Sequence, residues 1–187
     1  MNVKAQGLLN AARYVQEAHG NDVLAKVLAA CGPAVRERCI SAIAINWHPL
    51  EEFTEFLVAT AKIVPDPLVG EKIGAFGARA NTRGVMLRLG LMLSNPETVL
   101  QRASAMWRRY NDEGSLSLLR GDKNRIEVVI AGIPRTPRIF CDTVTGWARE
   151  LIVSAGGKGA VASHMECRSL GDARCVWTAK WAGLEKE

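Results

Sequence analysis

The feature that most constrains the fold is a cysteine- and histidine-bearing stretch near the C-terminal end, from residue 141 to residue 181. Three of the five cysteines and one of the three histidines fall within it. Its first part carries Trp147, Leu151 and Ile152 at the spacing of one helix face. A glycine-rich break follows, and two β-branched and aromatic runs then flank Gly171-Asp172, which is the pattern of a β-hairpin.

Four side chains of this stretch form a candidate metal site: Cys141, His164, Cys167 and Cys175. Thiolates with one imidazole are typical of a closed tetrahedral zinc site, which is structural because no position remains for water. Regular strand alternation would place His164 and Cys167 on opposite faces, so the site requires a bulge or an early strand end between them. If His164 points away, Glu166 or a water is the alternative fourth ligand. The spacing contains no C-x-x-C pair, and a second interpretation is that these cysteines are ordinary small core residues.

The order of helix, glycine break, His-x-x-Cys, Gly-Asp turn and final cysteine resembles the C-terminal motif of the four-vinyl-reductase superfamily. This superfamily shares its α/β fold with haem-nitric-oxide-binding domains and with Bet3-type vesicle-tethering subunits. The resemblance to its phenol-sensing regulators implies a structural zinc ion on the same four places, with His164 replacing a carboxylate. Nearly the whole chain, including Trp47-His48-Pro49 and Gly146-Trp147, resembles a myxobacterial paralogous family of unknown function.

The chain divides into a helical part and a mixed part within one predicted domain of residues 1–187. Residues 1–113 carry helical patterns, and the segment 68–80 has Gly70 and Gly74 one above the other, which predicts close helix packing. Residues 114–187 follow a hairpin–helix–hairpin pattern. We therefore expect an α+β fold in which the helical half packs on a four-stranded antiparallel sheet. The resemblance implies the haem-nitric-oxide-binding/Bet3-like version of this fold.

Composition and motifs argue against several classes of protein. A net charge of +5 does not by itself indicate a nucleic-acid-binding surface, and no nucleic-acid-binding motif accompanies it. The most apolar run, residues 85–93, is interrupted by Arg88 and is too short to span a bilayer. Five cysteines without a signal-peptide pattern indicate reduced thiols. We expect a cytoplasmic protein with no membrane span and no nucleic-acid partner.

The resemblance implies a non-catalytic sensory or signalling domain that binds a small hydrophobic molecule between its helices and its sheet. The residues expected near this pocket are Trp47, Phe76, Met106, Trp107, Tyr110 and Trp147. One alternative is a dimeric adaptor like the tethering subunits, with a filled core and no ligand. Another is a thiol-dependent or reductase-like enzyme, in which Cys141 lies at a helix N-terminus and His164 assists it. A cavity above about 300 Å³ would favour the sensor.

Partners and cofactors follow from the same patterns. The surplus of amphipathic helices over one sheet predicts a homodimer formed through the N-terminal helices, and a protein partner is a further possibility. One structural zinc ion per chain is expected, and no haem. The haem-binding relatives combine a proximal histidine with a tyrosine-serine-arginine motif that we do not find. His48 is expected to be exposed beside Trp47, which either packs against the following helix or lines the pocket with it.

Overall fold

The computed structural model describes residues 1–81, 103–120 and 124–184. The N-terminal part is mainly helical and contains β1 (Asn2–Lys4), α1 (Gln6–His19), α2 (Asn21–Ala29), α3 (Pro33–Ser41), β2 (Trp47–Pro49), α4 (Leu50–Ile63) and α5 (Val69–Asn81). The C-terminal part contains α8 (Ala103–Tyr110), β3 (Ser115–Arg120), β4 (Arg125–Ala131), α9 (Arg138–Ser154), β5 (Gly157–Lys158), β6 (Val161–Glu166), η1 (Arg168–Leu170), β7 (Cys175–Lys180) and β8 (Gly183–Leu184). Each helix in these ranges is too short or too polar to cross a lipid bilayer.

The two predicted hairpins join into one antiparallel sheet. Its strand order is β3-β4-β7-β6, so the returning strand of each hairpin lies in the centre. Ile130 pairs with Cys175 and Val128 with Trp177, and all four side chains are buried. Central strands covered by protein on their faces carry continuous apolar runs, as β7 does. The predicted α+β fold with a four-stranded antiparallel sheet is confirmed.

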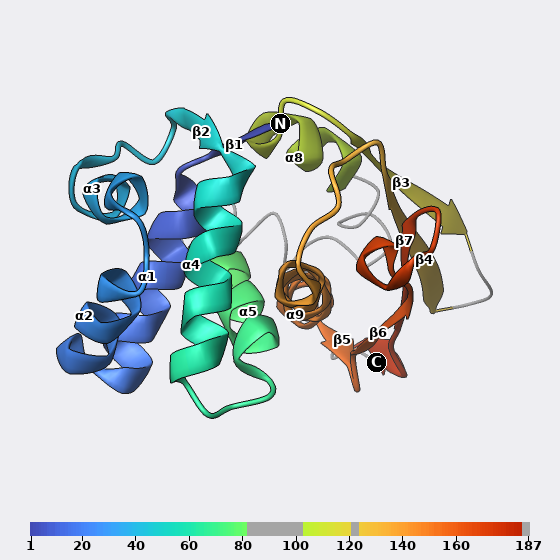
Figure 1. Cartoon of the computed structure of the whole chain (residues 1–187). Coiled ribbons are helices and arrows are strands. Elements are labelled where there is room, and N and C mark those ends of the chain that lie inside the picture. Colours follow the sequence, from blue (N-terminus) through green and yellow to red (C-terminus); the bar gives the residue numbers. More distant parts are fainter. Residues whose placement is uncertain (82–102, 121–123, 185–187) are drawn as a thin grey trace.

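Helix α9 lies between the sheet and the N-terminal helices, as Figure 1 shows. It approaches α5 so closely that the two backbones touch. A Cβ atom on Gly74 would lie 2.7 Å from the carbonyl carbon of Thr143, and one on Gly146 would lie 2.6 Å from that of Glu71. Glycine is required at both positions because a side chain would overlap the facing peptide group. The close helix packing predicted from the small residues of α5 is confirmed.

Two three-residue strands pair segments that are far apart in the sequence. Strand β1 pairs with β2, placing Val3 opposite His48 and Lys4 opposite Trp47. Because neighbouring residues of a strand face opposite sides, His48 is buried and Trp47 lies on the surface beneath the Lys4 ammonium group. The sequence-based expectation for this pair, an exposed His48 and a packed Trp47, was therefore wrong.

Candidate functional site

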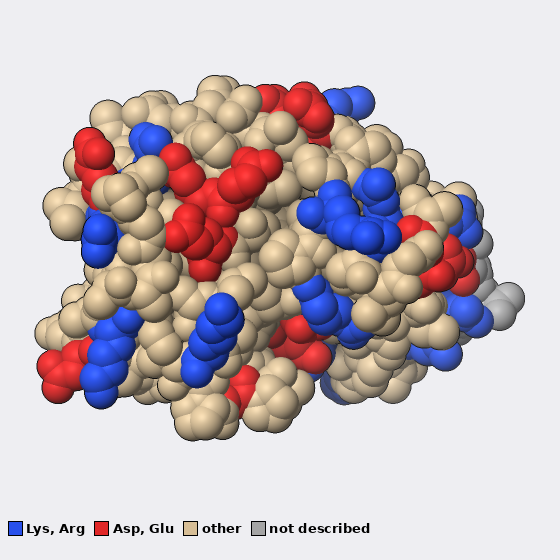
Figure 2. Space-filling model, viewed as in Figure 1, with Lys and Arg blue, Asp and Glu red and all other residues tan. Residues whose placement is uncertain are grey.

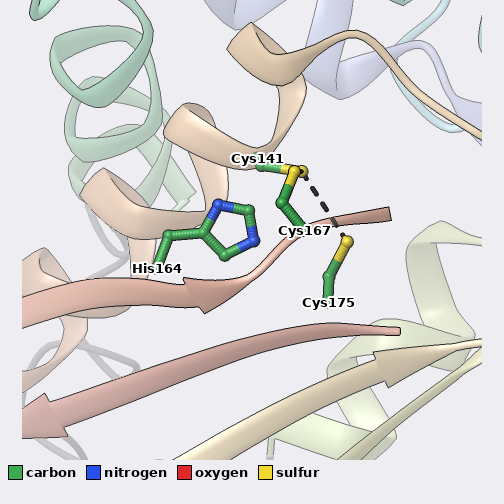
Figure 3. Close-up of side chains that lie close together, drawn as sticks. All are labelled: Cys141, His164, Cys167 and Cys175. Carbon is green, nitrogen blue, oxygen red and sulfur yellow. Dashed lines mark hydrogen bonds between the residues drawn. The ribbon is translucent and has the colours of Figure 1, made fainter. Parts of the chain in front are cut away.

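The four predicted metal ligands come together at one end of the sheet. Cys141 is in the first turn of α9, His164 is on β6, Cys167 follows β6, and Cys175 begins β7. Their ligand atoms all lie within 4.8 Å of one another, and Figure 3 shows the side chains converging. The Cys141 and Cys175 Sγ atoms are 3.9 Å apart, and those of Cys167 and Cys141 are 4.0 Å apart. These distances match the edge of about 3.8 Å that a tetrahedron with Zn–S bonds near 2.3 Å requires.

An irregularity in β6 brings His164 and Cys167 to the same side of the sheet. The pairing of β6 with β7 shifts register between His164 and Glu166, and the strand ends at Glu166. The extra residue rotates the following side chains, which is the usual effect of a β-bulge. The predicted requirement for a bulge or an early strand end is confirmed. The Glu166 carboxylate instead pairs with Arg174 at 3.1 Å, which leaves His164 as the nearer candidate for the fourth ligand.

The His164 side chain is half-buried, and its two ring nitrogens are buried close to the cysteine sulfur atoms. Neither Nδ1 nor Nε2 has a hydrogen-bond partner in the described part of the chain. The ring stacks on Trp177, whose Nε1–H donates to Thr145 Oγ1 of α9 at 2.9 Å. A buried imidazole normally satisfies at least one nitrogen, because an unpaired polar atom costs about 1–3 kcal/mol. Metal ligation by one of these nitrogens would remove that cost.

The hydrogen bond between Cys141 and Cys175 shifts the pKa values of the two thiols in opposite directions. The hydrogen bond between Cys141 and Cys175 raises the pKa of the Cys141 thiol, and burial raises it further. The same bond lowers the pKa of the Cys175 thiol, with help from His164 and from the Arg168 N–H, which donates to its sulfur at 3.4 Å. The fold thus favours a thiolate at Cys175, and a thiolate is the form that ligates a metal ion.

The other two cysteines lie away from this cluster. Cys31 follows α2 and Cys39 is on α3, and both contact the apolar core. Burial raises the pKa of each thiol, most strongly at Cys39, where it reaches about 11. Their environment is that of packed apolar residues, in line with the sequence-based interpretation.

A mainly apolar cavity of about 180 Å³ lies between α1, α5, α8 and α9. Four of the predicted pocket residues line it: Met106, Trp107, Tyr110 and Trp147. The structure places two others elsewhere. Trp47 is 44% exposed beside Lys4, and Phe76 packs edge-on against Tyr14. Further described lining comes from β1, α1, α4, α5, the sheet and α9: Val3, Lys4, Gln6, Gly7, Asn10, Phe53, Ile73, Gly74, Gly77, Asn81, Asn111, Leu116, Ile130, Phe140, Thr143 and Val144.

A short chain of side-chain amides crosses the cavity wall. Gln6 Nε2 donates to Asn10 Oδ1 at 3.0 Å, and Asn10 Nδ2 donates to Asn81 Oδ1 at 3.1 Å. Asn10 is 7% exposed although it lies beside the buried apolar residues of α1. The sequence-based pocket omitted these three residues. The available signal was an asparagine among buried positions of an amphipathic helix, where a polar residue requires a partner.

A second buried histidine forms a polar group at the start of α4. His48 Nδ1 lies 3.1 Å from Glu52 Oε2, which also accepts a hydrogen bond from Arg38 Nε at 3.0 Å. Burial lowers the pKa of His48, and the charge of Glu52 offsets this only in part. Burial pushes the pKa of Glu52 upward, but Arg38 and His48 outweigh that effect and its pKa is lowered.

Comparisons with known proteins identify the fold. No protein-family model and no curated protein matches the chain. An H-NOX protein from S. oneidensis, solved in the Fe(II) ligation state, matches with a TM-score of 0.73 at 14% identity over 97% of each chain. Its Fe(II)NO form matches with a TM-score of 0.71 at 15% identity, over 96% of this chain and 99% of that one. An oxygen-binding H-NOX domain related to soluble guanylate cyclases matches with a TM-score of 0.66 at 11% identity, over 94% and 93%. The chain has an H-NOX-like fold, as the resemblance to haem-nitric-oxide-binding domains implied.

This comparison contradicts the expectation that no haem is bound. Proteins of this fold include ones solved in Fe(II) states, and one study describes haem distortion in the H-NOX family. A missing sequence motif was therefore insufficient ground for excluding haem. The histidines of this chain lie at positions 19, 48 and 164, outside the described cavity lining. The described cavity wall holds no histidine that could ligate a haem iron. The wall does carry Tyr110 and Met106, and tyrosine and methionine side chains ligate haem iron in other proteins.

Proposed function

We propose that this chain is a non-catalytic sensory domain that binds a small molecule in the cavity between α1, α5, α8 and α9. The observation that carries the proposal is the apolar cavity, which a helical adaptor with a filled core would lack. The cavity volume of about 180 Å³ does not reach the roughly 300 Å³ expected from the sequence for a sensor pocket, so the cavity supports only a small ligand. The H-NOX-like fold supports the proposal, because the matched H-NOX structures include an Fe(II) form, an Fe(II)NO form and an oxygen complex. Membership of the narrower paralogous family remains an inference from the sequence.

The cavity selects for a compact and mostly apolar ligand. Its volume of about 180 Å³ is below the range of about 300–1,000 Å³ typical of drug-sized ligands. The Gln6–Asn10–Asn81 amide chain supplies hydrogen-bonding groups on a mainly apolar wall, which also carries Lys4, Asn111 and Thr143. A few polar groups on an apolar wall fix the orientation of a ligand, so the preferred ligand carries one hydrogen-bonding group. A larger ligand such as haem would require the cavity to widen.

The sulfur cluster is proposed as a structural metal centre. Three thiols and one imidazole form a donor set typical of zinc, and the sulfur spacing already suits a tetrahedron. The metal would join the start of α9 to β6 and β7, and so hold the helix that carries Phe140, Thr143 and Trp147 in the cavity wall. This role requires no open coordination position.

The same geometry disfavours a thiol enzyme. Cys141, Cys167 and Cys175 are each at most 3% exposed, so a substrate could not reach their sulfur atoms without unfolding of the turn around them. A nucleophilic cysteine requires access of the substrate to its sulfur atom, which the burial of these three residues prevents. The candidate nucleophile of the sequence-based alternative therefore fits ligation better than catalysis.

A cavity-filling variant tests the ligand proposal. Gly77 lines the cavity, and a Cβ atom there would meet only Asn10 Nδ2, at 3.7 Å. Gly77→Leu should therefore fill the cavity while preserving the fold. We expect small neutral aromatic alcohols to shift backbone amide NMR signals of α1 and α5 in the wild type and in Gly77→Ala, but not in Gly77→Leu. Equal shifts in the filled variant would place binding elsewhere and contradict the proposal.

Haem is tested in the same pair of variants. A Soret band that appears on titration with haemin and is lost in Gly77→Leu would identify haem as a cavity ligand. The described lining predicts that such a band depends on Tyr110 or Met106 and is unchanged in His48→Gln. A band lost in His48→Gln would contradict this assignment of the axial ligand.

We also propose that the protein is a homodimer formed through its N-terminal helices. The support is the amphipathic character of α1, α2 and α4 and the exposed apolar side chains near α3. Light scattering at high micromolar concentration should give twice the mass of the 20.3 kDa chain. A mass equal to one chain would contradict this proposal without affecting the cavity.

A further inference from the structure

An exposed apolar patch lies at the end of α3 and in the connection to β2. Ile40, Ile43 and Ile45 are 84%, 63% and 73% exposed. Three isoleucines within six residues facing water are unusual, because isoleucine is among the residues most often fully buried. Contiguous exposed apolar side chains commonly mark an interaction site. We call these three residues the isoleucine patch.

Exposed acidic side chains lie on α3 and α4, the helices on either side of the connection that carries the isoleucine patch. Glu37 of α3 and Glu51 and Glu55 of α4 are exposed, and Figure 2 shows acidic atoms gathered over the start of α4. Exposed Arg36 offsets part of this charge, while Arg38 is already paired with Glu52. The acidic residues disfavour an anionic membrane surface as the partner, and they disfavour a second isoleucine patch bearing the same charges.

A basic patch lies on the same face of the molecule, beyond the α4–α9 junction (Figure 2). We assign to it Arg135 and Arg168, which are in contact, together with Arg138 and Arg174, which are close to them in the sequence. Leu170, two residues after Arg168, is 72% exposed. Arg138 and Arg174 are paired with Asp142 and Glu166. Arg135 donates to the Arg168 carbonyl and Arg168 to the Ile133 carbonyl, and within the described ranges neither guanidinium group meets a carboxylate. We call this group the arginine patch.

We propose that the isoleucine patch of one copy docks on the arginine patch of a second copy, and that the contact occurs twice around a two-fold axis. The inference rests on the proposed homodimer and extends its interface, because the end of α3 in the N-terminal part of one copy would meet η1 and the start of α9 in the C-terminal part of the other. Both patches lie on one face, so an axis passing between them places each patch opposite its complement. This is the arrangement of an isologous interface, in which residue i meets residue j and residue j meets residue i.

Each part of the contact matches in chemistry. Leu170 would enter among Ile40, Ile43 and Ile45, which removes apolar surface of both copies from water. The guanidinium groups of Arg135 and Arg168, which contact carbonyl oxygens but no carboxylate within the described ranges, would face Glu37, Glu51 and Glu55. Opposite charges at the rim of an apolar contact set its register and exclude incorrect partners.

Analytical ultracentrifugation of the full chain and its variants tests the proposal. Ile43→Asp and Leu170→Asp should each raise the dimer dissociation constant by at least about tenfold, because each buries an unpaired charge in the contact. Val153→Asp is the matched control, since Val153 is 49% exposed on α9 outside both patches, and it should leave the constant unchanged. Circular dichroism and melting temperature verify that each variant is folded.

A charge exchange supplies the sharper test. Glu51→Arg and Arg135→Glu should each weaken the dimer by roughly tenfold, and the double variant should recover most of the loss because the attractive pair is restored in reverse. If the losses of dimer stability in Glu51→Arg and Arg135→Glu simply added up in the double variant, the proposed pairing would be overturned.

Dissociation of the dimer by Ile43→Asp but not by Leu170→Asp would indicate that the isoleucine patches of the two copies pair with each other, and would also overturn the proposal. A wild-type monomer would overturn both this inference and the homodimer, whereas a dimer insensitive to all four substitutions would overturn only this inference.

Discussion

The imidazole of His164 lies flat against the indole of Trp177, with ring centroids 4.3 Å apart and an angle of 8° between the ring planes. Trp177 thus contacts a candidate metal ligand directly and is itself held to α9 through Thr145. Binding of zinc to His164 places positive charge next to the indole. We expect zinc added to metal-free protein to change the tryptophan fluorescence and the near-ultraviolet circular dichroism, with saturation at one ion per chain.

Trp177→Phe separates this effect from the other four tryptophans. It should bind the same amount of zinc and lose most of the spectral change, because the phenyl ring preserves stacking but removes the indole signal. An unchanged zinc response in this variant would show that the signal arises elsewhere and that His164 is not engaged.

The contact between α5 and α9 predicts a large difference between two glycine substitutions on the same helix. Gly74→Ala should destabilise the fold by about 3 kcal/mol or more, because its methyl group would overlap the Thr143 carbonyl and force the helices apart. Gly77→Ala should be neutral or stabilising by up to about 1 kcal/mol, since its methyl group meets only the Asn10 amide and alanine favours a helix. Urea unfolding of the two variants measures the difference, and similar stabilities would contradict the backbone contact.

The sequence predicted the sheet and the sulfur cluster because their determinants are local. The Gly171-Asp172 turn and the three hairpin ligands lie within twelve residues, and the need for a bulge follows from strand alternation alone. The burial of His48 depended on pairing between β1 and β2, two three-residue strands more than forty residues apart. Strands of three residues carry no periodic signal. The sequence therefore could not predict which strand pairs with which, or which side chains of each strand point to the core.

The cavity was predictable only in part for a related reason. Met106, Trp107, Tyr110 and Trp147 are large and stand at inward positions of predicted helices, so they were natural candidates. Trp47 is also large and aromatic, but its position on β2 directs its side chain to the surface. The amide chain depends on contacts between α1 and α5, which sequence alone does not place next to each other.

The His48–Glu52–Arg38 group predicts a loss of stability on mild acidification. The pKa of folded His48 is lowered, so the unfolded chain binds its proton at higher pH than the native chain does. The stabilisation is therefore complete above the ordinary histidine pKa of about 6.5 and declines as the pH falls from there toward the lower folded value. Glu52 also has a lowered pKa, so its contribution declines only at lower pH, below the ordinary glutamate value of about 4.3.

Urea unfolding at several values between pH 7.5 and about pH 5 tests the assignment to His48. The wild type should lose stability across this interval. His48→Asn retains a donor toward Glu52 but has no group that titrates there, so its curve should be flatter. Parallel curves for the two proteins would assign the pH dependence to other groups.

Loss of one thiol ligand should lower stability through loss of the metal. We expect Cys167→Ser to melt roughly 5–15 °C below the zinc-bound wild type, since each kcal/mol shifts the midpoint of a chain of this size by about 2–4 °C. A chelator should lower the melting temperature of the wild type and of Cys31→Ala by the same amount, because Cys31 lies outside the cluster. A full chelator response in Cys167→Ser would contradict the ligand assignment.

The central claim is that Cys141, His164, Cys167 and Cys175 hold one metal ion that fastens α9 to the sheet. Native mass spectrometry of the protein, purified without chelator and supplied with zinc at equimolar concentration, measures this directly. The account predicts one zinc ion on each folded chain of the wild type, and none on each folded chain of Cys167→Ser. A wild-type spectrum of folded chains without metal would contradict it, and these cysteines would then be core residues.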